Sequence, residues 1–194
     1  LSKGISWITF QNECAAIRID DQLCKQGKGI TLYSSFKQNL KGDKMYTVFE
    51  DSEGDEWILT NKGISIIGKK QVDSDFPFQY IKEADGIIYL VSQSDKLASY
   101  NFKTRQFKFI EIPYHVSMIN EVKKFDSNTL LLATDNGLII YKIKEKEFQL
   151  IDIRTSTQPS SVVQSVYQDH YKELWIFPQT TGVIRYNPST EEMQ

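Results

Sequence analysis

Residues 45–67 read MYTVFEDSEGDEWILTNKGISII. Three short apolar runs, MYTVFE, EWILT and ISII, are separated by two turn-forming segments, SEGD and NKG. Runs rich in β-branched and aromatic residues, bounded by Gly, Asn, Asp and Ser, are typical of antiparallel strands joined by hairpin turns. The stretch therefore predicts three consecutive strands of one antiparallel sheet.

The same order of elements returns at residues 163–186, which read VQSVYQDHYKELWIFPQTTGVIRY. In this second copy Asp169 matches Asp51, and Trp175 matches Trp57. Two degenerate copies lie between them, with Tyr89 and Leu131 in the place of the tryptophan, and a partial copy opens the chain with Trp7.

The equivalent positions 7, 57, 89, 131 and 175 are 50, 32, 42 and 44 residues apart, with a mean of 42. This period is typical of the blades of a β-propeller, each built from four short strands. We predict an all-β chain of about four to five four-stranded antiparallel blades, partial at both ends and part of a larger, seven-bladed array. Residues 1–194 form one propeller segment without a second domain, with blade parts at about 1–37, 44–76, 77–113, 118–153 and 162–194.

Outer strands are expected at 107–109 and 148–150, because apolar and polar residues alternate there. The 32-residue spacing predicts a stunted outer strand near 69–73. The three-residue period of Ile119, Val122 and Phe125 favours a helix locally. We nevertheless expect a strand there, because this segment occupies the innermost-strand position of its repeat.

The repeated residues are expected to be structural. A large flat ring on the second strand can fill the wedge between neighbouring blades, and this role is predicted for Trp7, Trp57 and Trp175. A sugar-stacking platform is the alternative. Asp51 and Asp169 each close a first strand and can accept hydrogen bonds from the following turn. Glycines at the hairpin turns supply positive φ angles, at Gly63, Gly137 and Gly182.

This pattern resembles the two-component regulator propeller repeat, and the resemblance extends over residues 7–188. It is carried by Asp51, Gly54, Trp57-Ile58, Thr60 and Gly63-Ile64, echoed by Asp169, Trp175-Ile176, Gly182-Val183 and Tyr186-Asn187-Pro188. It implies the periplasmic sensor region of a Bacteroidetes hybrid two-component histidine kinase, anchored in the inner membrane, homodimeric and responsive to oligosaccharides. The kinase would lie outside this chain. Repeat residues are scaffold in that family, so the resemblance implies no binding residue.

Composition excludes some partners and sites. The 23 Lys and Arg are balanced by 25 Asp and Glu along the chain, so a nucleic acid partner is not expected. The two cysteines, Cys14 and Cys24, can either close a small disulfide loop or remain unpaired thiols.

Catalytic chemistry has little support in the sequence. The two histidines, His115 and His170, belong to no cluster with metal-ligand spacing and no Ser-His-Asp order. No glycine loop has the spacing of a nucleotide-binding motif. We therefore predict no catalytic residue, no metal and no cofactor in this segment. A propeller enzyme, a lyase or glycosidase with residues scattered around the central channel, is an open alternative.

Ligand contacts are expected in loops that join one blade to the next, because rigid scaffolds carry function on such loops. Three segments stand out, 34–44, 112–118 and 154–161. Aromatic faces and planar polar groups suit sugars, so the candidates are Tyr114, His115 and Arg154. The alternative for each is an ordinary surface residue.

Two functions of different classes follow from these expectations. The first is an extracytoplasmic sensor segment that binds a periplasmic ligand, an oligosaccharide, and relays it to a distant kinase together with further blades of the same protein. The second is a propeller scaffold for protein partners, which a peptide ligand without any response to carbohydrate would support.

Overall fold

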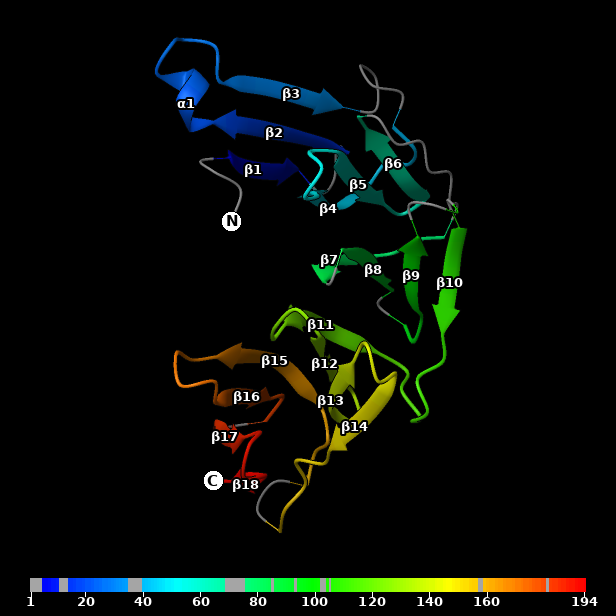
Figure 1. Cartoon of the computed structure of the whole chain (residues 1–194), viewed down its shortest axis with the longest axis vertical. Helices are drawn as coiled ribbons and strands as arrows, with labels where there is room; N and C mark the ends of the chain where they lie inside the picture. Colours follow the sequence, from blue (N-terminus) through cyan, green and yellow to red (C-terminus); the bar gives the residue numbers. More distant parts are fainter. Residues whose placement is uncertain are drawn as a thin grey trace. The chain divides into compact units, whose positions relative to one another are not determined.

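The structure of the chain is a computed structural model, which describes residues 5–10, 14–34, 40–68, 76–84, 86–92, 94–101, 104, 106–156, 159–180 and 182–194. The described elements are five antiparallel sheets and one short helix (Figure 1). The predicted all-β fold with blade-like antiparallel sheets is confirmed. Among the described elements no helix is long and apolar enough to cross a membrane.

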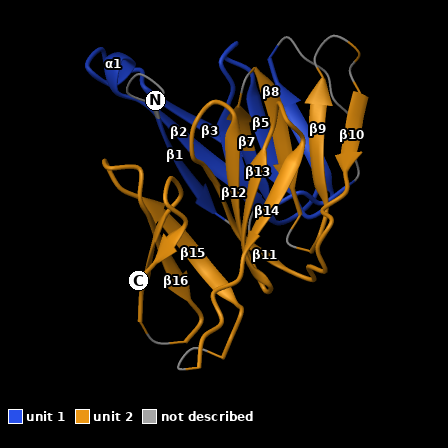
Figure 2. Cartoon of the chain, turned by 60° about the horizontal axis from the view of Figure 1, so that its bottom comes forward, with its two compact units in different colours: residues 1–81 blue, residues 82–194 orange. Residues whose placement is uncertain are grey.

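The chain divides into two compact units, residues 1–81 and 82–194, which Figure 2 shows in blue and orange. In the first unit, one sheet has the order β1-β2-β3 and a second has the order β4-β5-β6. Their strands are β1 (Ile5–Phe10), β2 (Ala15–Asp20), β3 (Ile30–Ser34), β4 (Met45–Glu50), β5 (Glu56–Thr60) and β6 (Gly63–Ile67), with helix α1 (Asp21–Cys24) after β2.

The remaining strands form three four-stranded sheets, in the orders β10-β9-β8-β7, β11-β12-β13-β14 and β15-β16-β17-β18. The third sheet consists of β7 (Tyr80–Ala84), β8 (Ile87–Val91), β9 (Leu97–Asn101) and β10 (Gln106–Ile110). The fourth consists of β11 (Ile119–Lys124), β12 (Thr129–Thr134), β13 (Gly137–Lys142) and β14 (Glu147–Ile151). The fifth consists of β15 (Val163–Gln168), β16 (Leu174–Pro178), β17 (Ile184–Asn187) and β18 (Glu192–Met193).

Strand position explains the sequence pattern of each strand. Central strands β12 and β13 carry the nearly continuous apolar runs TLLLAT and GLIIYK, and almost every residue in them is buried. The outer strands β10 and β14 lie at sheet edges and alternate in polarity, as expected for 107–109 and 148–150. Residues 119–124 are a strand, as predicted against their local helical period, because β11 pairs with β12. The stunted strand expected near 69–73 lies outside the described residues.

A hydrophobic core of the second unit lies between the fourth and fifth sheets. One wall is formed by apolar side chains of β12 and β13, and the other by apolar side chains of β15, β16 and β17. Leu131, Ala133 and Ile140 belong to the first wall, and Val166 and Ile176 to the second. Sheet-on-sheet burial of this kind is how propeller blades stabilise one another.

The tryptophans differ in their placement. Trp57 lies on β5, the second strand of its sheet, and is fully buried, as are Tyr89 and Leu131 at the equivalent positions. Trp175 lies on β16 and is half-buried. Trp7 differs from the expectation, because it lies on β1, the first strand of its sheet, and pairs with Arg18 of β2. In the sequence, Trp7 lies in a short apolar run that is followed by a turn and a second run. A first strand and a second strand of a blade share this pattern, so the pattern alone does not distinguish them.

Turn glycines and cysteines complete the scaffold. Gly63, Gly137 and Gly182 have φ angles of 125°, 102° and 99°. At Gly137 a Cβ atom would lie only 2.5 Å from the carbonyl oxygen of Ile151, so both the φ angle and the space require glycine. The cysteines form no disulfide: Cys14 is a buried thiol and Cys24 an exposed one.

Candidate ligand-binding loops

The loops at one end of the fourth sheet form a hydrogen-bonded frame around the β12–β13 turn. We call residues 114–118, 135–137 and 161 the loop frame. The segment 114–118 leads into β11, and Ser161 leads into β15. Two backbone hydrogen bonds join the turn to these segments. The Asp135 N–H donates to the Met118 carbonyl at 3.1 Å, and the Gly137 N–H donates to the Ser161 carbonyl at 2.8 Å.

Side chains of the turn tie the two loops together. The Asp135 carboxylate accepts the N–H of Ser117 on both oxygens, at 3.1 and 3.2 Å. The Asn136 amide donates to the carbonyl of His115 at 3.0 Å. The Ser161 hydroxyl donates to the carbonyl of Asp135 at 2.9 Å. Incoming loop, turn and outgoing loop are therefore held as one rigid surface.

The frame brings together two of the three candidate residues. The Tyr114 hydroxyl donates to the backbone carbonyl of Phe148 at 2.9 Å, so this side chain fixes the loop to β14. His115 is held through its carbonyl and keeps its imidazole exposed. An exposed ring on a fixed backbone is available to a ligand, whereas the Tyr114 hydroxyl is already engaged.

Arg154 lies in a local pair apart from that frame. Its guanidinium binds Asp152 in a fork, with Nε–Oδ1 at 2.9 Å and Nη2–Oδ2 at 2.6 Å. The hydrogen bonds from Arg154 lower the pKa of Asp152, and the carboxylate in turn raises the pKa of Arg154. A bidentate pair uses the directional donors of Arg, so Arg154 is a weaker candidate for a ligand contact than His115.

The second sheet repeats this design, which the sequence analysis missed. The Asn61 amide oxygen accepts the N–H groups of Asp43 and Lys44 at 3.2 and 3.1 Å, and its nitrogen donates to Asp43 at 2.6 Å. Thr60 and Thr134 each donate a hydroxyl proton to the carbonyl of the glycine three residues later. The shared signal is Thr-x-x-Gly, in TNKG and TDNG, and it marks both turns.

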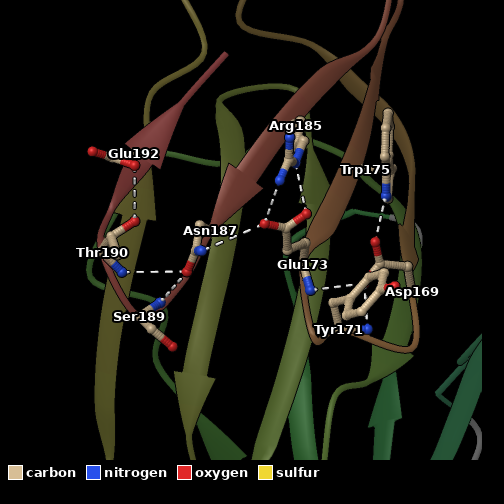
Figure 3. Close-up of polar contacts among 9 residues, drawn as sticks. All are labelled: Asp169, Tyr171, Glu173, Trp175, Arg185, Asn187, Ser189, Thr190 and Glu192. Atoms are coloured by element: carbon tan, nitrogen blue, oxygen red, sulfur yellow. Dashed lines mark hydrogen bonds and ion pairs between the residues drawn. The ribbon is translucent and has the colours of Figure 1, made fainter.

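The other end of the blades carries an Asp–Trp clasp. Asp51 accepts from the N–H groups of Glu53 and Asp55 at 2.9 and 3.0 Å, and from the Trp57 indole at 2.9 Å. Asp169 makes the same three contacts, with the turn N–H groups and with the Trp175 indole at 3.0 Å (Figure 3). The bond from Trp175 lowers the pKa of Asp169. The expected turn-capping role of both aspartates is present, and the indole bond is an addition to it.

A partly buried ionic cluster lies between the two sheets of the first unit. Arg18 Nε is 3.1 Å from Glu56 Oε1, and Arg18 Nη2 is 3.8 Å from Glu50 Oε2. Burial raises the pKa of Glu56, although Tyr33 and Arg18 favour its charged form. Two carboxylates beside one guanidinium form a partly buried ion network between the two sheets.

Metal chemistry finds no support in the part of the chain that is described, where no three His, Cys, Asp or Glu side chains gather into a possible metal site. Both histidines are exposed, His115 in the loop frame and His170 in the turn that follows Asp169.

Comparison with known proteins gives structural matches only. No family model matches the chain, and no curated protein sequence matches it. An extracellular domain of a one-component system from B. thetaiotaomicron matches 94% of this chain with a TM-score of 0.69 and 18% identity. An extracellular domain of a hybrid two-component system from the same organism matches 93% with a TM-score of 0.70 and 20% identity.

The chain spans about a quarter of these two proteins, 26% and 25% of their lengths. Virginiamycin B lyase from Staphylococcus aureus also matches, over 100% of this chain and 66% of the lyase, with a TM-score of 0.76 and 18% identity. Because the sequence identities are this low, the structural matches establish the fold alone. The chain is a β-propeller segment, similar in structure to the extracellular domains of bacterial signalling proteins.

Proposed function

We propose that this chain is an extracytoplasmic sensor segment of a two-component signalling protein. The observation that carries the proposal is its structural match, over more than nine-tenths of its length, to extracellular domains of one-component and hybrid two-component systems. The Asp–Trp repeats that resemble the two-component regulator propeller support the same reading.

The proposed ligand is an oligosaccharide that contacts the loop frame. Three chain segments meet there, and hydrogen bonds join them in the ligand-free structure. Preorganised loops bind with little loss of conformational entropy. A ligand that prefers one arrangement of the signalling protein would shift its population and so change the state of a distant kinase.

The remaining assignments follow from this role. The segment would lie in the periplasm, as part of an inner-membrane protein, with further blades and signalling domains in the same protein. A homodimer would carry the signal between two copies. Because the kinase lies elsewhere, this segment would bind its ligand without turning it over.

The test is a thermal unfolding screen of this chain against a library of oligosaccharides, because a ligand bound only by the folded state raises the unfolding temperature. We expect a saturable rise with one class of sugar. The His115→Ala variant should lose that rise, since it removes the exposed ring but keeps the carbonyl that accepts from Asn136. His170→Ala is the matched control, because His170 is exposed but outside the frame. No rise with any sugar would argue against the proposal and favour a protein partner.

A lyase activity is the second candidate, because the match to virginiamycin B lyase covers the whole chain with a TM-score of 0.76. The test is incubation with virginiamycin B, followed by mass spectrometry of the products. Turnover that is lost in His115→Ala or His170→Ala would favour the enzyme over the sensor. An unchanged substrate would remove this candidate.

A further inference from the structure

A groove of about 550 Å³ lies between the third and fourth sheets, and it adjoins the loop frame at Phe148, whose carbonyl accepts the Tyr114 hydroxyl. Both walls belong to the second unit, and the strands that form them, β8 to β10 with β13 and β14, are labelled in Figure 2. This volume lies in the range of small-molecule sites, which run from about 300 to 1,000 Å³.

Aromatic rings line the groove on both sides. Tyr141 and Phe148 stack with ring centroids 4.3 Å apart, and Tyr89 meets Tyr141 edge-on at 6.3 Å. Lys108 of β10 lies on the same sheet face as Tyr89, because both residues flank Ser99 in the strand register. The half-buried Phe148 ring, supported by Tyr141, offers flat apolar surface on the wall of the fourth sheet, which suits the C–H face of a sugar ring.

The charge of the groove is strongly positive for a chain whose formal net charge is -2. Three lysines line it, Lys108 from β10 and Lys144 with Lys146 from the β13–β14 turn, against one carboxylate, Glu111. Within the described residues, Lys108 and Lys146 form no ion pair, so both ammonium groups are available to an incoming anion. Ammonium groups on two facing walls attract an anion placed between them.

Hydrogen bonds to Asn128 fix the backbone of the β13–β14 turn, which carries Lys144 and Lys146. Asn128 accepts the Lys144 N–H on its side-chain oxygen at 2.9 Å, and its backbone carbonyl accepts the Ile143 N–H at 2.8 Å. Glu145 lies between the two lysines in sequence, and its carboxylate accepts a hydrogen bond from the Asn128 amide at 2.8 Å. Glu145 is not part of the groove lining. Lys146 has a φ angle of 57°, an unusual conformation for a residue with a side chain.

We propose that this groove binds an acidic saccharide, a sugar that carries a carboxylate or sulfate group. The sugar ring lies against Phe148, and the anion lies among the three lysines. The inference rests on the proposed sensor function and names both a ligand class and a binding place that adjoins the loop frame but shares no lining residue with it. A neutral sugar satisfies only the aromatic part of the groove, so the acidic group decides the affinity.

The experiment is isothermal titration calorimetry of the whole chain with digalacturonate and with a sulfated N-acetylglucosamine, each compared with its neutral counterpart. We expect the acidic sugars to bind at least about tenfold more tightly, with affinity that falls as salt rises. Lys108→Gln and Lys146→Gln should each weaken binding by about three- to tenfold. Lys124→Gln is the matched control, an exposed lysine of the fourth sheet outside the groove, and it should leave binding unchanged.

The outcomes separate this proposal from the sensor function. Equal affinity in Lys108→Gln and Lys146→Gln, with binding of neutral sugars intact, would overturn the groove and leave the sensor function standing. Displacement of the sugar by equimolar inorganic sulfate would reduce the groove to a bare anion site and overturn the saccharide. No heat with any sugar, acidic or neutral, would contradict the proposed function as well.

Discussion

The single residue that explains most of the repeat is the aspartate of the Asp–Trp clasp. One carboxylate satisfies two turn N–H groups and the indole N–H of a tryptophan six residues later, in both well-formed copies. A buried indole needs an acceptor. Where Leu131 replaces the tryptophan that need disappears, and the position six residues earlier is Phe125 rather than aspartate.

Replacing Asp51 with alanine should therefore destabilise the chain strongly. The change removes the acceptor of three donors, one of them the indole of fully buried Trp57. We expect a loss of about 3 kcal/mol in the free energy of unfolding, measured in urea. In a double-mutant cycle with Trp57→Phe the two losses should be less than additive. A loss below about 1 kcal/mol would show that water replaces the carboxylate.

Acid should act on the stability in two opposite ways. Burial raises the pKa of Glu56 above its ordinary value of 4.5, so protonation of Glu56 favours the folded state. Its contribution is complete below the unfolded pKa and is lost as pH rises through the folded pKa. Stability should therefore increase as pH falls from neutral toward that ordinary value of 4.5. Glu56→Gln should flatten this rise in urea titrations at each pH, and an unchanged rise would assign it to another group.

Below that range the sign reverses. The pKa of Asp169 is lowered by Trp175 and that of Asp152 by Arg154, so their contributions are present above the ordinary pKa and are lost as pH falls through the lowered one. We expect stability to fall below about pH 4. The comparison is between Trp175→Phe and the parent chain, because the variant lacks the indole donor and should lose less stability in acid.

Among the elements, the hairpin turns join the strands of each sheet, and the β12–β13 turn also hydrogen-bonds to the loops beside it. The strands could be predicted from the sequence because apolar runs and turn residues are local signals, as in EWILT followed by NKG. Helix α1 could not, since DQLC has no buried residue and is held by the Asp20 cap. The loop frame could not either, because Asn136 binds a carbonyl 21 residues away. The groove depends on how two sheets pack, which no local pattern records.

Gly137 and Gly54 offer a matched pair for the turns. Both have positive φ, 102° and 84°, but a Cβ at position 137 would meet the Ile151 carbonyl at 2.5 Å, whereas position 54 has open space around it. We expect Gly54→Ala to cost about 1 kcal/mol from backbone strain and Gly137→Ala clearly more. Equal losses in thermal unfolding would mean that the β12–β13 turn can shift away from β14.

Tyr114→Phe separates a scaffold role from a ligand role. The hydroxyl that donates to the Phe148 carbonyl is lost, and we expect stability to fall by about 1 kcal/mol while the phenyl ring remains. Sugar affinity should stay within about twofold of the parent chain, because the hydroxyl is already engaged. A large loss of affinity without a loss of stability would instead make this hydroxyl a direct ligand contact.

At the scale of the molecule, the second unit carries both candidate binding places, the loop frame at one end of the fourth sheet and the basic groove beside it. The first unit carries the partly buried ion network around Arg18. It also carries the hydrogen bonds between Asn61 and residues 43 and 44, which correspond to those of the loop frame. The first sheet also leaves Ile30 70% exposed and Ile8 47% exposed on one face. Recognition is thus expected in residues 82–194.

Hydrogen–deuterium exchange of the whole chain, with and without saturating acidic and neutral oligosaccharides, tests the sensor account most directly. We expect slower exchange in residues 114–118 and 135–137 of the loop frame or in residues 143–147 beside the groove, with the first unit unchanged. Exchange that is unchanged throughout the chain with every sugar would contradict the account.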